Sequence, residues 1–254
     1  MRSTVASNIR QAIFSRGFFI GVAGIVLVIF LSSAESILGA FRSDTPQSNG
    51  FHATLLFSAL SSDAMTLALP ILCALPYTAS FVEDIKSGFI RQYLHRTTVK
   101  SYLFGKTSAC AVSGGLVLPV GILAAYGISA LVFTPMEAVL AEGEPAQPYL
   151  AQLLVRLPLF FFSGAFWALL GMFFATLTNS KYMAYASPFI LYYVLIILHE
   201  RYFDTLYVLY PREWLAPSDF WVMDGFGVIL LLLELICIAS LGSALAAERR
   251  IRQI

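Results

Sequence analysis

Long hydrophobic stretches, separated by short polar segments, run through the whole chain. Six of them are predicted to be membrane-spanning helices, since a helix needs about 20 apolar residues to cross a bilayer. They cover residues 17–39, 64–82, 107–133, 152–177, 182–199 and 225–246. Strands of a membrane barrel would instead alternate apolar and polar residues over about 10 positions. We therefore expect an all-α membrane protein with one transmembrane domain over residues 1–254.

The segment before the first stretch is amphipathic. Its apolar positions fall at helical spacing on one face, at Val5, Ile9, Ala12 and Ile13. A helix of this kind lies at the membrane surface, so residues 3–15 are predicted to form an N-terminal interface helix. Residues 40–63 and 134–150 are interpreted as polar loops, the second of them acidic.

A charged segment joins the second and third stretches, and it is predicted to be a short amphipathic helix over 84–95. Apolar side chains at helical spacing form one face: Ile85, Phe89, Ile90, Tyr93 and Leu94. Polar ones form the other: Asp84, Lys86, Ser87, Arg91, Gln92 and His95. Gly88 favours a bend near its start. Such a helix either lies on the membrane or docks on a soluble partner, and we favour docking.

The connection between the fifth and sixth stretches mixes charged and aromatic side chains, which is typical of the membrane–water boundary. Pro211 and Pro217 exclude one long helix. We expect two short helical pieces over 200–224 that enter the outer edge of the membrane and return, a re-entrant extracellular segment.

Composition agrees with the hydropathy pattern. Hydrophobic residues make up 58% of the chain and charged residues 12%, about half the share of a soluble protein. Mean hydropathy is +0.77. The net charge of +1 gives no reason to expect a nucleic-acid partner. The three cysteines lie in hydrophobic stretches without metal-site spacing. No cleavable signal peptide is recognised, so the first stretch is expected to remain as a span.

Positive charge predicts the orientation. Of the 16 Lys and Arg residues, all but four lie in the N-terminal segment, residues 83–106, the turn at Lys181 and the C-terminal tail; the exceptions are Arg42, Arg156, Arg201 and Arg212. Cytoplasmic loops carry the excess of positive charge. Both termini and the 84–95 helix are therefore predicted to face the cytoplasm of a multi-pass protein in the cell membrane.

No catalytic motif is recognised. Gly105-Lys106-Thr107 lacks the upstream glycine of a phosphate-binding loop, because Lys100 occupies that position. The chain also lacks a His-Glu-x-x-His motif and a Gly-x-Ser nucleophile paired with a histidine inside a span. We therefore expect neither catalytic residues nor a bound cofactor in this chain.

Glu234 lies nine residues into the last stretch, where an ionised side chain costs about 2.5–3.5 kcal/mol. It must be protonated, paired or exposed to a polar path. One interpretation is a structural hydrogen bond, with Tyr192 or Tyr193 as donor. The other is that these residues line a translocation path.

Taken together, the chain resembles the permease subunits of ABC-2 type ATP-binding cassette exporters, in particular those of lantibiotic self-immunity systems. The resemblance lies in Phe81-x-x-Asp84-x-x-x-Gly88-x-x-Arg91, followed by Arg96, Tyr102 and Lys106. Tyr210-Pro211-x-x-Trp214-Leu215 before the last stretch supports it, as do the six-span order and the amphipathic N-terminus.

This resemblance implies a permease that moves a peptide antibiotic or another amphipathic compound outward. It also implies a separate nucleotide-binding subunit, which binds ATP and Mg and docks on the coupling helix at 84–95. The expected contacts with that ATPase are Asp84, Lys86, Gly88, Phe89, Arg91 and Tyr93. A second permease chain, identical or paralogous, would complete the transporter. The alternatives are a substrate-capture subunit of an importer and an intramembrane enzyme without a recognised motif.

Overall fold

The computed structural model describes residues 2–43, 45–93, 97–138, 148–218, 221 and 225–252. Helices account for the regular structure in this part of the chain. They are α1 (Arg2–Ile13), α2 (Arg16–Ser32), α3 (Ala34–Arg42), α4 (Phe51–Leu60), α5 (Asp63–Ala74), α6 (Ser80–Lys86), α7 (Phe89–Tyr93), α8 (Val99–Phe133), η1 (Thr134–Met136), α9 (Tyr149–Thr178), α10 (Lys181–Arg201), η2 (Tyr207–Leu209) and α11 (Phe226–Ile251).

Four helices among the described residues are long and apolar enough to cross a membrane: α8 with η1, α9, α10 and α11. Two further pairs pass the same test only together, because each is bent. The break between α1 and α2 turns the chain by 47°, and the break between α4 and α5 turns it by 72°. The prediction of a helical chain with several apolar segments of spanning length is confirmed, and the number of such segments is four to six.

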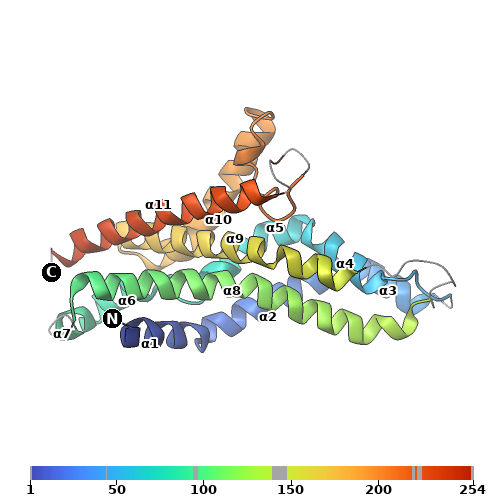
Figure 1. Cartoon of the computed structure of the whole chain (residues 1–254), viewed down its shortest axis with the longest axis horizontal. Coiled ribbons are helices and arrows are strands. Elements are labelled where there is room, and N and C mark those ends of the chain that lie inside the picture. Colours follow the sequence, from blue (N-terminus) through green and yellow to red (C-terminus); the bar gives the residue numbers. More distant parts are fainter. Residues whose placement is uncertain are drawn as a thin grey trace.

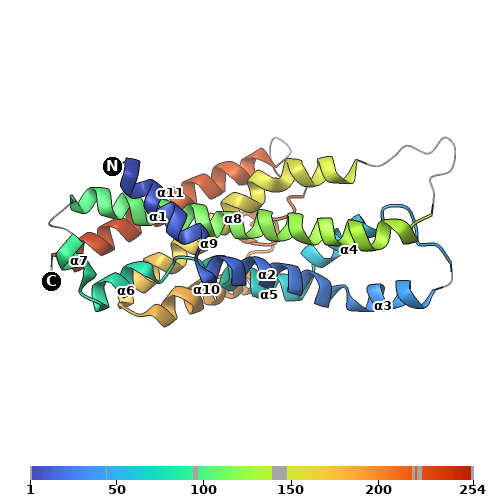
Figure 2. The same ribbon diagram turned by 90° about the horizontal axis from the view of Figure 1, so that it is seen from below.

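The long helices form an elongated bundle around α9, which packs against α8, α10, α11 and α5. Two glycines lie where α8 packs against α9. A Cβ atom added at Gly164 would lie 2.7 Å from the carbonyl oxygen of Gly114, so only the missing side chains permit this contact. Both termini lie at the same end of the bundle as α6 and α7, while α3 lies toward the opposite end (Figures 1 and 2).

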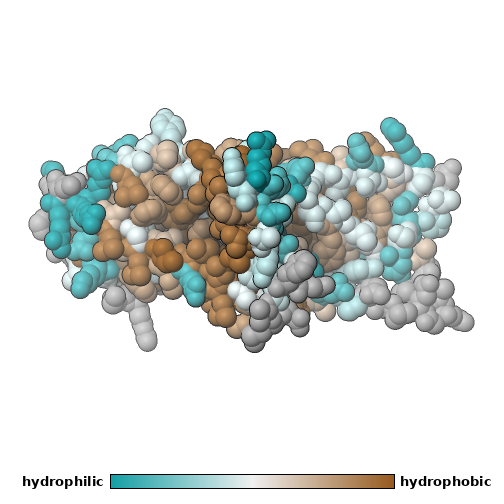
Figure 3. Space-filling model, turned by 90° about the horizontal axis from the view of Figure 1, so that it is seen from above, coloured by the Kyte–Doolittle hydropathy of each residue, from teal (hydrophilic) through white to brown (hydrophobic). Residues whose placement is uncertain are grey.

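Hydrophobic side chains also cover much of the outer surface. On the face shown in Figure 3 they form a broad band next to the hydrophilic end of the molecule. Large apolar residues are exposed on several helices, including Leu31, Leu131 and Ile238. A surface of this kind suits contact with lipid or with another apolar partner.

The fourth, fifth and sixth predicted stretches agree with α9, α10 and α11 to within a few residues. The third is longer than predicted: α8 begins at Val99, where the Thr98 hydroxyl accepts a hydrogen bond from the Ser101 N–H at 3.3 Å. That cap lets the charged residues Lys100 and Lys106 join the helix, whereas the hydropathy boundary at 107 marks only where the sequence becomes apolar.

Three predictions in the N-terminal half are wrong in detail. The first stretch is interrupted at Ser33 and becomes α2 and α3. Residues 40–63 are not a continuous loop, because α4 forms there and buries Ala53, Leu56 and Ala59. The helix of the second stretch ends at Ala74 rather than 82.

The connection between α10 and α11 also differs from the prediction. Its described residues contain the 3₁₀ turn η2 and further turns instead of two short helices. It nevertheless returns to the bundle, where Trp214 and Leu215 are buried. The Trp214 ring stacks on Trp167 of α9 with centroids 5.7 Å apart, and its Nε1–H donates to the Val208 carbonyl at 3.1 Å. The connection is thus held against the bundle by the packing of Trp214 and not by short helices.

Candidate functional site

The charged segment after α5 folds as two short helices with a sharp bend between them. Gly88 has a φ of +74°, and residues with a Cβ atom rarely adopt this backbone conformation. The predicted bend at Gly88 is therefore confirmed. The prediction of a single helix over 84–95 is wrong, because α6 ends at Lys86 and α7 begins at Phe89. Leu94, His95 and Arg96 lie outside the described residues.

An ion pair ties α6 to α8. The Asp84 Oδ2 atom lies 2.7 Å from Nζ of Lys106, and their side chains are 19% and 6% exposed. The Tyr102 hydroxyl, one helical turn before Lys106, donates to the same Oδ2 atom at 2.6 Å. Charge and hydrogen bonding thus both hold the Asp84 carboxylate, which is the condition for burying a charge without a large loss of stability.

Tyr77 extends this cluster to the N-terminal helix. Its hydroxyl accepts a hydrogen bond from Lys106 Nζ at 3.1 Å and donates toward the side-chain oxygens of Asn8 and Gln11, 3.4 and 3.5 Å away. The Lys106 ammonium also lies 4.7 Å from the centroid of the Tyr77 ring. The polar cluster Asp84–Tyr102–Lys106–Tyr77 therefore connects α1, α6 and α8.

The apolar face predicted for this segment is divided by the bend. Ile90 is buried, while Phe89 is 45% exposed and stacks on Tyr93 with ring centroids 5.3 Å apart. The Tyr93 ring in turn packs against the Tyr102 ring, with centroids 5.6 Å apart. The segment is thus attached to the bundle by Ile90 and the polar cluster, and it presents Phe89 outward.

Part of the predicted polar face is exposed, whereas Asp84 is held in the polar cluster. The Lys86, Arg91 and Gln92 side chains lie at the surface of the molecule. The sequence singled out Asp84 and Lys106 as motif residues but did not pair them. The signal available was a lysine beside an apolar stretch and an aspartate on the preceding segment, which can neutralise each other's charge.

Glu234, Tyr192 and Tyr193 are not brought together. Glu234 is exposed on α11, and within the described residues it has neither a hydrogen bond nor an ion pair. Tyr192 is buried against Trp167, with ring centroids 5.0 Å apart. Tyr193 is half-exposed and stacks on Phe189. The predicted tyrosine hydrogen bond to Glu234 is absent from this part of the chain.

A second polar cluster, which the sequence did not suggest, lies just after η1. Glu137 accepts hydrogen bonds from the backbone N–H groups of His52 and Gly50 at 2.9 and 3.1 Å, and its Oε1 atom lies 2.7 Å from Nδ1 of His52. Burial alone raises the pKa of Glu137, but these hydrogen bonds and His52 outweigh it and hold the pKa below its ordinary value. The cluster fixes the start of α4 beside the end of α8.

The described residues contain no group of three or more His, Cys, Asp or Glu side chains that would suit a metal ion. Comparison with known proteins gives no family model that matches this sequence and no match among functionally characterised proteins.

Proposed function

We propose that this chain is a permease subunit of an ATP-driven ABC exporter. In this proposal it spans the cell membrane six times, with both termini in the cytoplasm, and exports a peptide antibiotic or another amphipathic compound. A separate nucleotide-binding subunit binds ATP and Mg and carries out hydrolysis. A second permease chain, identical or paralogous, completes the translocation route.

The observation that carries the proposal is the attachment of the α6–α7 segment. An element that transmits force must hold rigidly to the helix that it moves and must also offer an accessible surface to its motor. The Asp84–Lys106 pair supplies the first property, because it ties α6 to α8 at 2.7 Å. The exposed Phe89 ring and the exposed polar residues Lys86, Arg91 and Gln92 supply the second.

The proposed mechanism follows from these contacts. Closure of the two nucleotide-binding subunits displaces α7, and the bend at Gly88 passes the displacement to α6. The polar cluster then carries it to α8 through Lys106 and to α1 through Tyr77. Because α8 is 35 residues long, about 50 Å at 1.5 Å per residue, a tilt at one end reaches the far side of the bundle.

The test is to reconstitute this chain in membranes together with an ABC ATPase encoded beside the gene for the chain. Phe89→Asp should leave expression and folding unchanged and should abolish transport-coupled ATP hydrolysis, because it places a charge where an apolar ring docks. Tyr182→Asp is the matched control: Tyr182 is an exposed aromatic residue in the first turn of α10, outside the α6–α7 segment. It should retain coupling.

A photo-crosslinking amino acid at Gln92 tests the contact directly. Crosslinking of this residue to the ATPase supports the docking proposal. A wild-type rate of coupled hydrolysis in Phe89→Asp would contradict it, and so would labelling of residues 86–92 from outside the cell. Binding of the ATPase only through a third scaffold chain would favour a substrate-capture subunit instead.

A further inference from the structure

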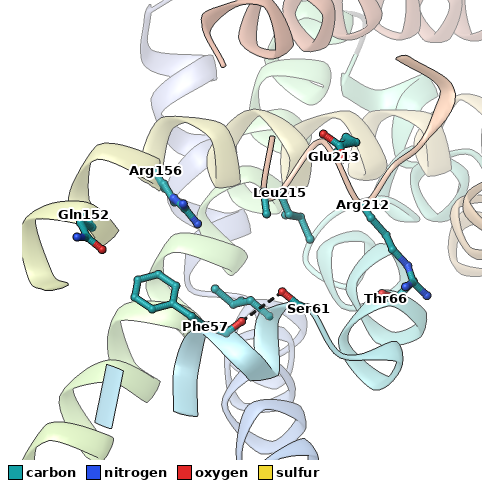
Figure 4. A pocket seen from close by; sticks show the side chains of 10 residues that line it. Phe57, Ser61, Thr66, Gln152, Arg156, Arg212, Glu213 and Leu215 are labelled. Atoms are coloured by element: carbon teal, nitrogen blue, oxygen red, sulfur yellow. Dashed lines mark hydrogen bonds between the residues drawn. The ribbon is translucent and has the colours of Figure 1, made fainter. Parts of the chain in front are cut away.

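A pocket with two guanidinium groups lies at the elbow between α4 and α5, away from the Asp84 cluster. It has a volume of about 440 Å³ and is bordered on its other sides by α9 and by residues 212–216 (Figure 4). This volume falls within the range of small-molecule sites. Its polar lining consists of Ser61, Thr66, Gln152, Arg156, Arg212 and Glu213.

The two arginines enter the pocket from different elements. In Figure 4, Arg156 extends from α9 toward Phe57, and Arg212 extends from the connection toward Thr66. The Arg212 Nη2 atom lies 2.6 Å from Asp63 Oδ1, whereas its Nε atom is buried without a hydrogen-bond partner. Arg156 has no ion-pair partner in the described part of the chain; its guanidinium carbon lies 5.6 Å from the centroid of the Phe57 ring.

Glu213 also lines the pocket, but hydrogen bonds hold its carboxylate. Its Oε2 atom accepts from the Ser218 N–H at 2.7 Å and from the Trp221 indole N–H at 3.2 Å. The exposed donors left for a ligand are therefore the Arg156 guanidinium and the Gln152 amide, whereas the Arg212 Nε–H is buried. A planar guanidinium forms bidentate contacts with carboxylate and phosphate oxygens.

The surroundings of Arg156 favour a ligand with an apolar tail. On α9, Val155 next to Arg156 is 80% exposed, and Leu154 is also exposed. A second cavity of about 350 Å³ shares Arg156 with this pocket. Its apolar lining comes from Val155 and Leu159 of α9 and from Phe226 and Ile229 of α11, and Pro217 and Ser218 of the connection complete it. A small inorganic anion would leave this apolar lining uncovered.

We propose that the pocket binds the phosphate diester of an anionic phospholipid, with Arg156 as the main charged contact and the acyl chain in the neighbouring cavity. The inference rests on the apolar helices of the chain and not on the proposed transport activity. It would hold equally for a membrane protein with another function.

The experiment uses the full chain purified in a neutral detergent and titrated with phosphatidylglycerol, with phosphatidylcholine of the same acyl chains, and with inorganic phosphate, read by native mass spectrometry. Phosphatidylglycerol should bind more tightly than phosphatidylcholine. Arg156→Gln should weaken its binding by about tenfold, the scale of one lost charge-assisted hydrogen bond. Arg156→Lys should restore part of that loss.

Arg201→Gln is the matched control, because it removes an exposed arginine in the last turn of α10 that does not line the pocket. It should bind phosphatidylglycerol as the wild type does. Equal weakening in Arg201→Gln and Arg156→Gln would overturn the proposal, since both would then report general surface charge. So would equal affinity for the two lipids, or displacement of phosphatidylglycerol by an equal concentration of inorganic phosphate.

Discussion

The Oδ2 atom of Asp84 lies 2.7 Å from Nζ of Lys106, although 22 positions separate the two residues in sequence. The pair joins a helix of seven residues to the longest helix among the described residues, α8. Because α6 is too short to be stable alone, its position depends on this contact and on its buried apolar residues Phe81 and Val82.

The ion pair should therefore be a major contribution to stability. Asp84→Asn and Lys106→Met should each lower the free energy of unfolding by about 3 kcal/mol, because each leaves a buried or partly buried charge without its opposite charge. The double variant should lose clearly less than the sum. Thermal unfolding of the purified variants measures the difference. Lys86→Met, at an exposed position on the same helix, is the control, and additive losses in the double variant would contradict the pairing.

The Trp214 side chain should hold the α10–α11 connection on the bundle. Trp214→Ala should lower the free energy of unfolding by about 3–5 kcal/mol, as for other buried large aromatic residues, and should expose residues 202–213 to proteolysis. Trp214→Phe should lose less, since it keeps an aromatic ring but not the hydrogen bond to Val208. Tyr202→Ala, where the side chain is 70% exposed, should change neither measurement.

Glu137 predicts a loss of stability in acid. Its pKa is lowered in the folded chain, so the stabilisation is complete above the ordinary glutamate pKa of about 4.3. It is lost as the pH falls through the lowered value. As the pH falls below about 4.3, the melting temperature of the wild type should therefore drop, and that of Glu137→Gln should change less. Parallel curves for the two proteins would show that Glu137 does not cause the acid sensitivity.

Glu234 should be dispensable for folding of the single chain. Because its carboxylate has no partner within the described residues, Glu234→Gln and Glu234→Leu should keep wild-type expression and melting temperature. Leu233→Gln, at the neighbouring exposed position on α11, is the control for the effect of adding a polar group to the same surface. A marked fall in the melting temperature of Glu234→Gln would reveal a partner for this carboxylate.

Several features were predictable from the sequence because they depend on local composition. Uninterrupted apolar stretches identified α9, α10 and α11, since a segment of that length has few other ways to satisfy its backbone. The bend at Gly88 was predictable for a similar reason: a residue without a Cβ favours the left-handed conformation. The break at Ser33 was missed, because serine is compatible with a helix and only packing decides where the axis turns. The helix α4 was missed because residues 40–63 were interpreted as a polar loop, although the predicted start of the second stretch at 64 agrees with the start of α5.

Hydropathy along the chain thus determined the helical class and the position of the long apolar segments. Tertiary structure alone decided that Asp84 meets Lys106, that Glu137 meets His52, and that Arg156 and Arg212 line one pocket. The physical reason is that an ion pair or a pocket depends on the relative position of two helices. That position is set by contacts distributed over both helices, such as the approach of Gly114 to Gly164. It therefore cannot be predicted from any short stretch of sequence.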